Sequence, residues 1–445
     1  PEYRLRRDIL SREVERVLAE GVELRLSHSF GTDVTLDSLY GQGYEAVFLA
    51  IGARRGRLLN LSGASLDGVV NGIDFLLNIN LGYKVEIGRR VVVVGGGNVA
   101  MDVARVSLRA GLEAEAGVMG KTLTDAARAA LRLGARAVTI ACLESREEMP
   151  AFAEEIEEAI EEGITLRPRV GPVSIAGEDS KAVGLVVRQV SSVFDEAGRF
   201  NPSFIPGTEE MLPADTIILA VGQAVDRIAL ASIRDLALHP GGTVVVDPQT
   251  LETSVPGVYA GGDVAFGPRN VIEAVADGRK AATAIHNRLG GKRRRLWRIR
   301  FRPADGHLPP HDFYRTPRQR IPTVPADRRT GFTEIETGYD EETARREANR
   351  CLRCHIQTIF DSARCIMCGG CVDVCPERCL RMVDAASLQA DIDLGPLLET
   401  LGGEPALAII KDEDRCIRCG LCADRCPVHA ITMELMEVEE VEIDA

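Results

Sequence analysis

Eight cysteines near the end of the chain repeat one spacing twice. The spacing is Cys-x2-Cys-x2-Cys-x3-Cys-Pro, and the two runs are Cys365, Cys368, Cys371, Cys375 and Cys416, Cys419, Cys422, Cys426. Thiolates in this pattern bind two [4Fe–4S] clusters, because three cysteines of a run wrap around one cluster and the fourth reaches the other. The expected ligand sets are Cys365, Cys368, Cys371 and Cys426 for the first cluster, and Cys416, Cys419, Cys422 and Cys375 for the second cluster.

Zinc is the other metal that so many cysteines could bind. A structural zinc site takes four ligands, often from two Cys-x2-Cys pairs, so the third cysteine of each run would be surplus. Gly369, Gly370 and Gly420 lie within the runs and give the backbone freedom that a tight loop around a cluster needs. The sequence therefore favours iron–sulfur clusters over zinc.

Three further cysteines, Cys351, Cys354 and Cys379, lie outside the two ligand sets. Cys351 and Cys354 follow a predicted helix over residues 340–350 that is rich in Glu and Arg. Two interpretations stay open. These cysteines bind a third cluster or a metal, with a ligand from a partner chain, or they are free thiols packed beside the first cluster.

A strand, a glycine-rich turn and a helix are predicted between residues 90 and 106. The β-branched run 90–94 is typical of a buried parallel strand. In the G-x-G-x-x-A turn that follows, the first glycine permits the tight turn, the second lets the backbone approach a pyrophosphate, and the alanine permits close helix packing. The helix N-terminus favours phosphate. The residues expected to contact a dinucleotide are Gly95, Gly96, Gly97, Asn98, Val99 and Ala100.

The next predicted strand, 137–142, ends in a segment that bears on the choice of nucleotide. Glu144 follows this strand, and an acidic residue there accepts hydrogen bonds from the adenosine ribose of NAD, whereas a basic residue favours NADP. Glu144 and Arg146 are therefore expected to contact the nucleotide, and NAD(H) is expected rather than NADP(H). Glu144 lies 49 residues after Gly95, compared with about 20 in the usual motif, so an insertion that adds a helix is predicted near residues 113–124.

Three other predicted strands, 46–50, 216–220 and 257–260, end in small residues. An Asp on a Gly-Asp turn suits the ribityl chain of a flavin, and the start of the following helix suits the electron-rich pyrimidine edge of its ring. These features predict a flavin site. The residues expected to contribute to it are Gly52, Gly222, Gly262, Asp263, Val271 and Ile272.

Composition excludes several classes of protein. The net charge of the 445 residues is −13, which disfavours nonspecific DNA binding. Aromatic residues make up 4%, too few for nucleic-acid stacking platforms, and no apolar run is long enough to span a membrane. Eleven of the twelve cysteines follow residue 350, which fits a cytoplasmic enzyme with a metal-binding module better than a disulfide scaffold.

Residues 1–290 resemble the flavoprotein small subunit of glutamate synthase and its relatives, which are glutathione-reductase-like flavoproteins with two dinucleotide-binding domains. The matching segments are 1–5, 48–53, 95–104, 145–151 and 257–263, and the helix before Cys351 matches as well. The cysteine runs extend the resemblance to relatives with fused bacterial ferredoxin domains. It implies FAD, a nicotinamide nucleotide and electron exchange with iron–sulfur clusters, whereas glutamate synthesis in this family belongs to a partner.

The sequence departs from this family in two places. Leu143 and Glu144 replace a pair of arginines that the family uses for NADP, which strengthens the expectation of NADH. The family also begins with an FAD-binding G-x-G-x-x-G segment, and no such motif precedes Gly95. We expect either that the sequence is incomplete or that another chain supplies the adenine-binding half of the FAD site.

The expected fold is an α/β two-dinucleotide-binding flavoprotein that lacks its N-terminal FAD segment, followed by an α+β ferredoxin-like domain. The predicted parts are a partial FAD domain (1–85), an NAD(P) domain (86–240), a return to the FAD domain (241–290), a basic, proline-rich linker (291–339) and the ferredoxin domain (340–445). The linker is either solvated, docked on an acidic surface of this chain or a partner, or bound to nucleic acid, which is the least favoured of the three.

The expected function is flavin-dependent electron transfer between NAD(H) and the clusters, within a complex of redox subunits. Hydride transfer is the chemistry of the cofactors, so no catalytic side chain is assigned. Two alternatives are an NADPH-dependent glutamate synthase small subunit and a non-catalytic electron-transfer scaffold.

Overall fold

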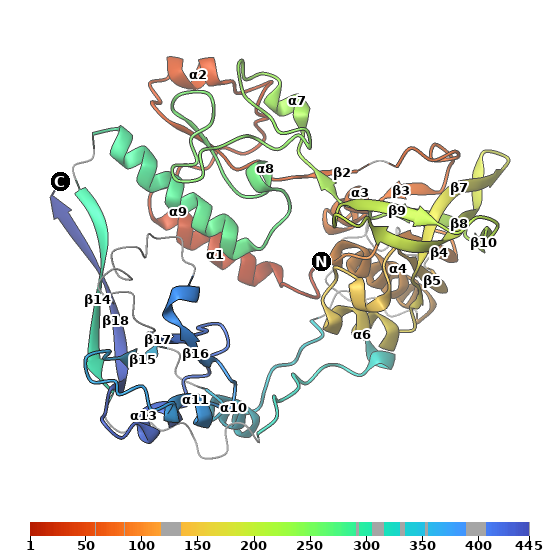
Figure 1. The fold of residues 1–445 in the computed structure, drawn as a ribbon. Helices are drawn as coiled ribbons and strands as arrows, with labels where there is room; N and C mark the ends of the chain where they lie inside the picture. Colours follow the sequence, from red (N-terminus) through yellow and green to blue (C-terminus); the bar gives the residue numbers. More distant parts are fainter. Residues whose placement is uncertain are drawn as a thin grey trace. The chain divides into compact units, whose positions relative to one another are not determined.

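The computed structural model describes residues 1–57, 59–83, 85–116, 135–290, 293–304, 316–329, 334–351, 355–388 and 406–444. The chain divides into two compact units (Figure 1). Unit 1 comprises Pro1–Gly291 and Thr323–Thr337, and unit 2 comprises Lys292–Pro322 and Gly338–Ala445. Each unit is described by itself below.

A five-stranded parallel sheet forms the centre of the nucleotide-binding part of unit 1. Its strands, in spatial order, are β3 (Val69–Asn71), β11 (Thr216–Leu219), β4 (Arg90–Val94), β5 (Ala137–Ala141) and β6 (Thr165–Arg167). Its strand residues are mostly apolar because both faces of the sheet are covered. The predicted strands 90–94, 137–142 and 216–220 are thereby confirmed.

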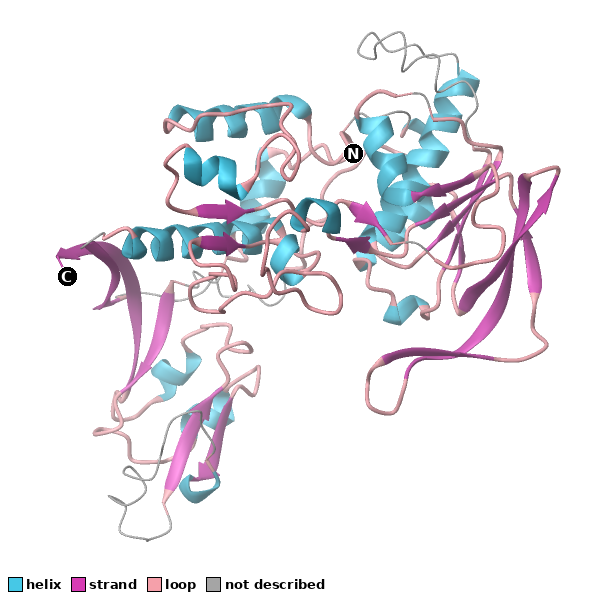
Figure 2. Ribbon diagram, turned by 90° about the horizontal axis from the view of Figure 1, so that it is seen from above, coloured by secondary structure: helices cyan, strands magenta, loops and turns pink. Residues whose placement is uncertain are grey.

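Helices cover one face of this sheet and a second sheet covers the other. Val91 and Val93 pack in one core with residues of α3 (Gly72–Asn80), α4 (Asn98–Ala116) and α6 (Ala153–Glu161). Val92 and Val94 point the opposite way, as the two-residue period of a strand requires, into a second core. That core is shared with an antiparallel sheet of β7 (Val170–Glu178), β8 (Lys181–Phe194), β9 (Phe200–Phe204) and β10 (Glu210–Pro213), whose long strands are visible in Figure 2.

The rest of unit 1 surrounds a small parallel pair of strands. β1 (Val47–Leu49) pairs with β13 (Val258–Ala260), so segments about 200 residues apart meet as the predicted flavin domain requires. Two short strands that pair with each other, β2 (Arg55–Gly56) and β12 (Gln223–Ala224), connect this part to the nucleotide-binding part. The helices here are α1 (Arg7–Ala19), α2 (Leu36–Gly41), α7 (Arg227–Leu230), α8 (Asp263–Phe266) and α9 (Val271–Arg288).

Part of the segment predicted as a linker, 291–339, packs into unit 1. Val324 N–H donates to the carbonyl of Ile335, and Ile335 belongs to the core beneath α4. The side chain of Arg329, which follows the short 3-10 helix η2 (Ala326–Arg328), is 3% exposed and donates to the carbonyl of Val324 at 2.7 Å. The chain thus leaves unit 1, returns to it and leaves it again.

The other described part of that segment is a strand of unit 2. β14 (Arg293–Pro303) pairs antiparallel with β18 (Ile431–Asp444), which pairs in turn with β15 (Ile356–Phe360). Arginines of β14 face glutamates of β18, with ion pairs from Arg300 to Glu439 and from Arg302 to Glu437. The acidic surface that this basic segment contacts is therefore in the same chain.

The cysteine runs lie in the remainder of unit 2. Two short helices, α11 (Gly370–Val374) and α13 (Leu421–Arg425), pack against each other. α11 also contacts β16 (Leu380–Asp384), which pairs antiparallel with β17 (Leu407–Lys411), and α13 contacts β18. The predicted helix before Cys351 is α10 (Glu341–Ala348), and η3 (Ala385–Ser387) follows β16.

The predicted insertion near residues 113–124 is described only to Ala116, where α4 ends, and its remainder lies outside the described residues. In the part of the chain that the structure describes, no helix has the length and apolar content needed to cross a bilayer.

Candidate functional site

The two cysteine runs adopt the same backbone conformation. Positions of the second run follow those of the first by 51 residues. Gly369 and Gly420 precede α11 and α13 with φ of 74° and 77°, a left-handed conformation that suits glycine. Met367 and Arg418 have φ of 53° and 54°. The chain therefore forms one cluster-binding loop twice, as the repeated spacing predicts.

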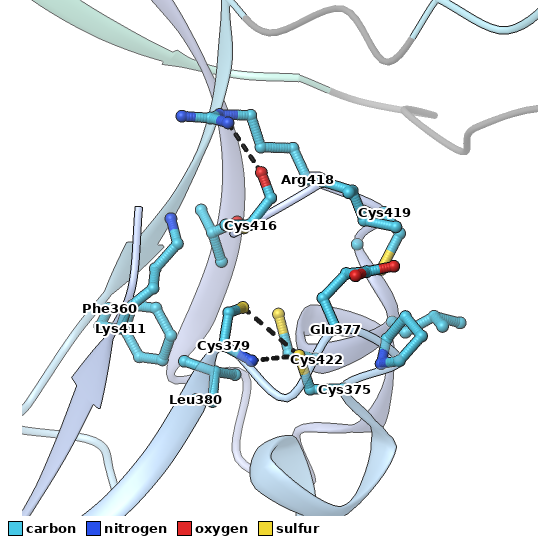
Figure 3. A pocket seen from close by; sticks show the side chains of 15 residues that line it. Phe360, Cys375, Glu377, Cys379, Leu380, Lys411, Cys416, Arg418, Cys419 and Cys422 are labelled. Carbon is cyan, nitrogen blue, oxygen red and sulfur yellow. Dashed lines mark hydrogen bonds between the residues drawn. The ribbon is translucent and has the colours of Figure 1, made fainter. Parts of the chain in front are cut away.

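The four thiols predicted to bind the second cluster line one pocket. Cys416, Cys419 and Cys422 come from the loop and helix of the second run, and Cys375 comes from the end of the first run (Figure 3). A fourth ligand from the other run is the arrangement expected of a two-cluster domain. The donor set of four thiols drawn from both runs therefore fits a [4Fe–4S] cluster.

The predicted ligands of the first cluster occupy the equivalent positions. Cys365 and Cys368 lie in the first loop, Cys371 lies in α11, and Cys426 ends α13. Across the described ranges, no three Cys, His, Asp or Glu side chains are arranged to hold a single metal ion.

The last cysteine of each run accepts hydrogen bonds from backbone N–H groups. Cys426 Sγ accepts from Ala430 N–H at 3.2 Å, and Cys375 Sγ accepts from Cys379 N–H at 3.4 Å. Burial acts to raise the pKa of both thiols, but these and neighbouring backbone N–H groups outweigh it, so the pKa of Cys375 and of Cys426 is lowered. The thiolate is the form that binds metal, and the same donors would adjust the electronics of a bound cluster.

The three remaining cysteines have different surroundings. Cys351 is exposed, and Cys354 lies outside the described residues, so a third cluster there stays a prediction. Cys379 is buried and lines the second cluster's cavity, with its Sγ 3.4 Å from Cys375 Sγ. It thus lies beside the predicted second cluster, a position that the sequence did not predict.

The glycine-rich turn joins β4 to α4 as predicted. Gly95 has φ of 137°, and a Cβ there would lie 2.3 Å from the carbonyl oxygen of Ala220, so a side chain cannot be accommodated. A Cβ on Gly97, in contrast, would have no atom within 4 Å. The N-terminus of α4 follows, and Ala100 is fully buried against the sheet. The turn therefore leaves open space where a pyrophosphate would approach, and the residues present fit a dinucleotide.

Glu144 reaches back over this turn from the end of the neighbouring strand β5. A Cβ on Gly96 would lie 2.8 Å from Glu144 Oε2, so the carboxylate stands beside the glycine loop. Asn98 Oδ1 accepts a hydrogen bond from Phe152 N–H at 3.0 Å, which ties the segment after Glu144 to the start of α4. Arg146 is exposed in the short 3-10 helix η1 (Arg146–Glu148).

The predicted flavin residues lie at the ends of strands around β1 and β13. Gly262 follows β13 with φ of 67°, and its N–H donates to the buried Asp277. The Asp263 carboxylate accepts from Arg269 N–H at 3.1 Å. Val271 and Ile272 begin α9 and are 82% and 72% exposed, so the positive end of this helix is accessible to an electron-rich group. Gly52 and Gly222 lie just before the crossing strands β2 and β12, both with positive φ.

Sequence reasoning missed a buried charge network beneath the nucleotide-binding part. The side chains of Arg105 and Arg109 on α4 are 1% exposed, and both form ion pairs with Glu162, just after α6. The guanidinium of Arg109 lies 4.1 Å from the centre of the Tyr3 ring, and Arg329 of the returning segment also donates to Glu162. The sequence signal for this network was the spacing of the charges. The two arginines lie four residues apart on α4, and the glutamates 155, 158 and 162 lie along one face of α6 and its end.

Comparisons with known proteins agree with these two kinds of site. A family model described as "Pyridine nucleotide-disulphide oxidoreductase" matches residues 7–278, and one described as "4Fe-4S dicluster domain" matches residues 364–430. The second match favours iron–sulfur clusters over zinc.

Three relatives illustrate the similarity. The β subunit of an NADP(+)-dependent formate dehydrogenase from Moorella thermoacetica is 38% identical over 80% of this chain and 48% of its own length. The β subunit of an NADPH-Fe(3+) oxidoreductase from Geobacter sulfurreducens is 29% identical over 80% of this chain and 55% of its own. The NADPH glutamate synthase small chain of Escherichia coli is 30% identical over 65% of this chain and 60% of its own.

The chain thus spans about half the length of the first two of these relatives. The expected two-dinucleotide-binding α/β fold and the resemblance to the glutamate synthase small subunit are confirmed. This chain belongs to the pyridine nucleotide-disulphide oxidoreductase family and carries a 4Fe-4S dicluster domain.

Proposed function

We propose that this chain transfers electrons between a nicotinamide nucleotide and two [4Fe–4S] clusters by way of FAD, as a subunit of a larger redox complex. The observation that carries the proposal is the presence in one chain of an open dinucleotide turn at Gly97 and of a cavity lined by Cys375, Cys416, Cys419 and Cys422. Three relatives named as subunits or chains of redox enzymes support the partner assignment.

The chain's own residues would have the following roles. The Gly95–Ala100 turn binds the pyrophosphate of the nucleotide, and Glu144 accepts hydrogen bonds from its ribose. Gly262, Asp263 and the exposed start of α9 hold part of FAD. When bound, FAD accepts a hydride as an electron pair and the clusters carry electrons singly. A disulfide is not expected to be the acceptor, because Cys142 is the one cysteine of the sequence before residue 351.

We propose NADH as the preferred nucleotide because of Glu144. A carboxylate at the ribose repels the 2′-phosphate of NADPH and accepts hydrogen bonds from the 2′-hydroxyl of NADH. The names of the relatives refer to NADP(+) and NADPH, so a preference for NADPH is the outcome that would contradict this part of the proposal.

Anaerobic titration of the holoprotein with NADH tests the proposed function. We expect the flavin absorbance to bleach first and the broad absorbance of the clusters to follow. A chain in which chemical reductants bleach the clusters but neither NADH nor NADPH does would instead be an electron-transfer scaffold.

A further inference from the structure

A fifth thiol lies among the predicted ligands of the second cluster. Cys379 is not part of either Cys-x2-Cys-x2-Cys-x3-Cys run, and it is 4% exposed. Its Sγ is 3.4 Å from Cys375 Sγ, and it lines the same cavity as Cys416, Cys419 and Cys422 (Figure 3). Its apolar neighbours include Leu380 and Ile431. Sulfur at this distance is within reach of an S–H···S hydrogen bond.

The internal repeat supplies a matched position without this thiol. Ala430 stands 51 residues after Cys379, and its N–H donates to Cys426 Sγ at 3.2 Å, as the N–H of Cys379 donates to Cys375 Sγ. The preceding residues, Arg378 and His429, have φ of 50° and 49°. The two turns therefore give their last cysteine the same backbone donor, and at the residue that donates they differ by one side chain, a thiol at Cys379 and a methyl group at Ala430.

We propose that Cys379 donates a hydrogen bond from its thiol to the sulfur of Cys375 and thereby gives the second cluster a higher reduction potential than the first. This proposal rests on the two-cluster function proposed above. Hydrogen bonds to the sulfurs of a cluster stabilise its more negative, reduced form, and so raise its potential. The effect is stronger in a buried site, where little water screens the donor.

Charged residues also border the cavity, and two of them, Lys411 and Arg418, share the partner Glu413. Lys411 forms an ion pair with Glu413 at 2.9 Å, and Arg418 donates to the carbonyl of Cys416 at 2.8 Å and pairs with Glu413. In Figure 3 the guanidinium of Arg418 points away from the sulfurs, and the exposed Glu377 adds a negative charge at the rim. These charges are unchanged by replacement of Cys379, so that replacement isolates the effect of the thiol.

The two clusters would therefore be reduced in a fixed order. The first electron to arrive would reside on the second cluster, and the first cluster would be reduced only by a stronger reductant. The single side chain at position 379, rather than the ligand sets themselves, would set this order.

Potentiometric titration of the full chain, followed by EPR, tests the proposal in Cys379→Ala, Cys379→Ser and Ala430→Cys. In Cys379→Ala we expect one cluster to become about tenfold harder to reduce, which is about 59 mV for a one-electron couple. The serine variant keeps a donor and should recover part of this shift. In Ala430→Cys the other cluster should become easier to reduce by a similar factor. Cys142→Ala, which removes a buried thiol from unit 1, is the matched control and should move neither potential.

The iron and acid-labile sulfide contents of each variant distinguish the outcomes that would overturn the proposal from the outcome that would overturn the proposed function. Unchanged potentials in both Cys379→Ala and Ala430→Cys, with full cluster content, would overturn the proposal. Loss of about half the iron and sulfide in Cys379→Ala would also overturn it, because Cys379 would then be a ligand. Absence of clusters from the unmodified chain would instead overturn the function on which the proposal rests.

Discussion

The carboxylate of Glu144 stands against Gly96, so that a Cβ on this glycine would lie 2.8 Å from Glu144 Oε2. Glu144 lies shortly after β5, and Gly96 lies in the turn after β4, the neighbouring parallel strand. This contact places a negative charge where the adenosine ribose of a bound dinucleotide would lie. It is the structural basis for the proposed preference for NADH.

Replacing Glu144 with Arg should therefore reverse the nucleotide preference. We expect the ratio of kcat/KM for NADH to that for NADPH to fall by at least about tenfold. The guanidinium would attract the 2′-phosphate of NADPH, whereas the carboxylate of Glu144 repels it. Steady-state reduction of an artificial acceptor measures this ratio. Glu147→Arg is the control, since it makes the same charge change at an exposed position nearby, and an equal effect of both variants would refute the role of Glu144.

Substitutions at two glycines of the turn should affect nucleotide binding and folding differently. Gly97→Ala has room for the methyl group, so its melting temperature should stay close to that of the unmodified chain. Its affinity for nucleotide should fall about tenfold, because the methyl group occupies the path of the pyrophosphate. Calorimetric titration measures this affinity.

Gly95→Ala provides the contrast. The positive φ and the 2.3 Å approach to Ala220 should lower the free energy of unfolding by about 1–3 kcal/mol. Equal thermal stability of the two variants would mean that the turn does not have the described conformation.

The buried charge network should make the stability of unit 1 sensitive to acid. Burial acts to raise the pKa of Glu162, but hydrogen bonding and charge interactions with Arg109 and Arg105 outweigh it, so its pKa is lowered. A lowered pKa in the folded state means that the carboxylate stabilises the fold at neutral pH. This stabilisation is lost progressively as the pH falls from the ordinary Glu value of about 4.3 through the lowered pKa of Glu162.

Glu162→Gln should remove this contribution and destabilise the chain at neutral pH by about 3–5 kcal/mol, because Arg105 and Arg109 lose a buried partner. Chemical denaturation at pH 7 and pH 4 measures both effects. Glu157→Gln on α6, exposed to solvent, should change neither, and an acid dependence in Glu162→Gln as steep as that of the unmodified chain would contradict the assignment.

Arg329 should hold the returning segment, Thr323–Thr337, in unit 1. Its side chain donates to the carbonyl of Val324 and to Thr323 Oγ1 at 2.7 and 3.1 Å. In Arg329→Ala we expect faster hydrogen exchange over residues 323–329, because buried acceptors lose their donor. The adjacent Arg328→Ala, at an exposed position, is the control. Equal exchange in the two variants would show that Arg329 does not anchor this segment.

The sequence predicted the elements that depend on local pattern and spacing. The strand–turn–helix at Gly95 and the repeated cysteine runs each contain their own signal, because the turn and the cluster loop are built from adjacent residues. The resemblance to a known family predicted that residues 241–290 return to the domain of residues 1–85, and the parallel pairing of β1 with β13 joins these two segments.

Features made by distant residues were not predicted. The contact of Cys379 with Cys375 depends on a turn, and the buried pairing of Arg105 with Glu162 depends on how α4 packs beside α6. The basic segment starting at Arg293 was predicted to be part of a linker because residues 292–329 are rich in arginine and proline. Its partner strand, β18, lies more than a hundred residues later, so the backbone pairing and the cross-strand ion pairs that stabilise β14 could not be read from the segment itself.

The most direct test of the whole account is EPR of the holoprotein frozen after anaerobic addition of NADH, with iron and acid-labile sulfide measured on the same sample. We expect signals of reduced [4Fe–4S] clusters, with about eight iron and eight sulfide per chain. Zinc in place of iron and sulfide, or intact clusters that dithionite reduces and neither NADH nor NADPH does, would contradict it.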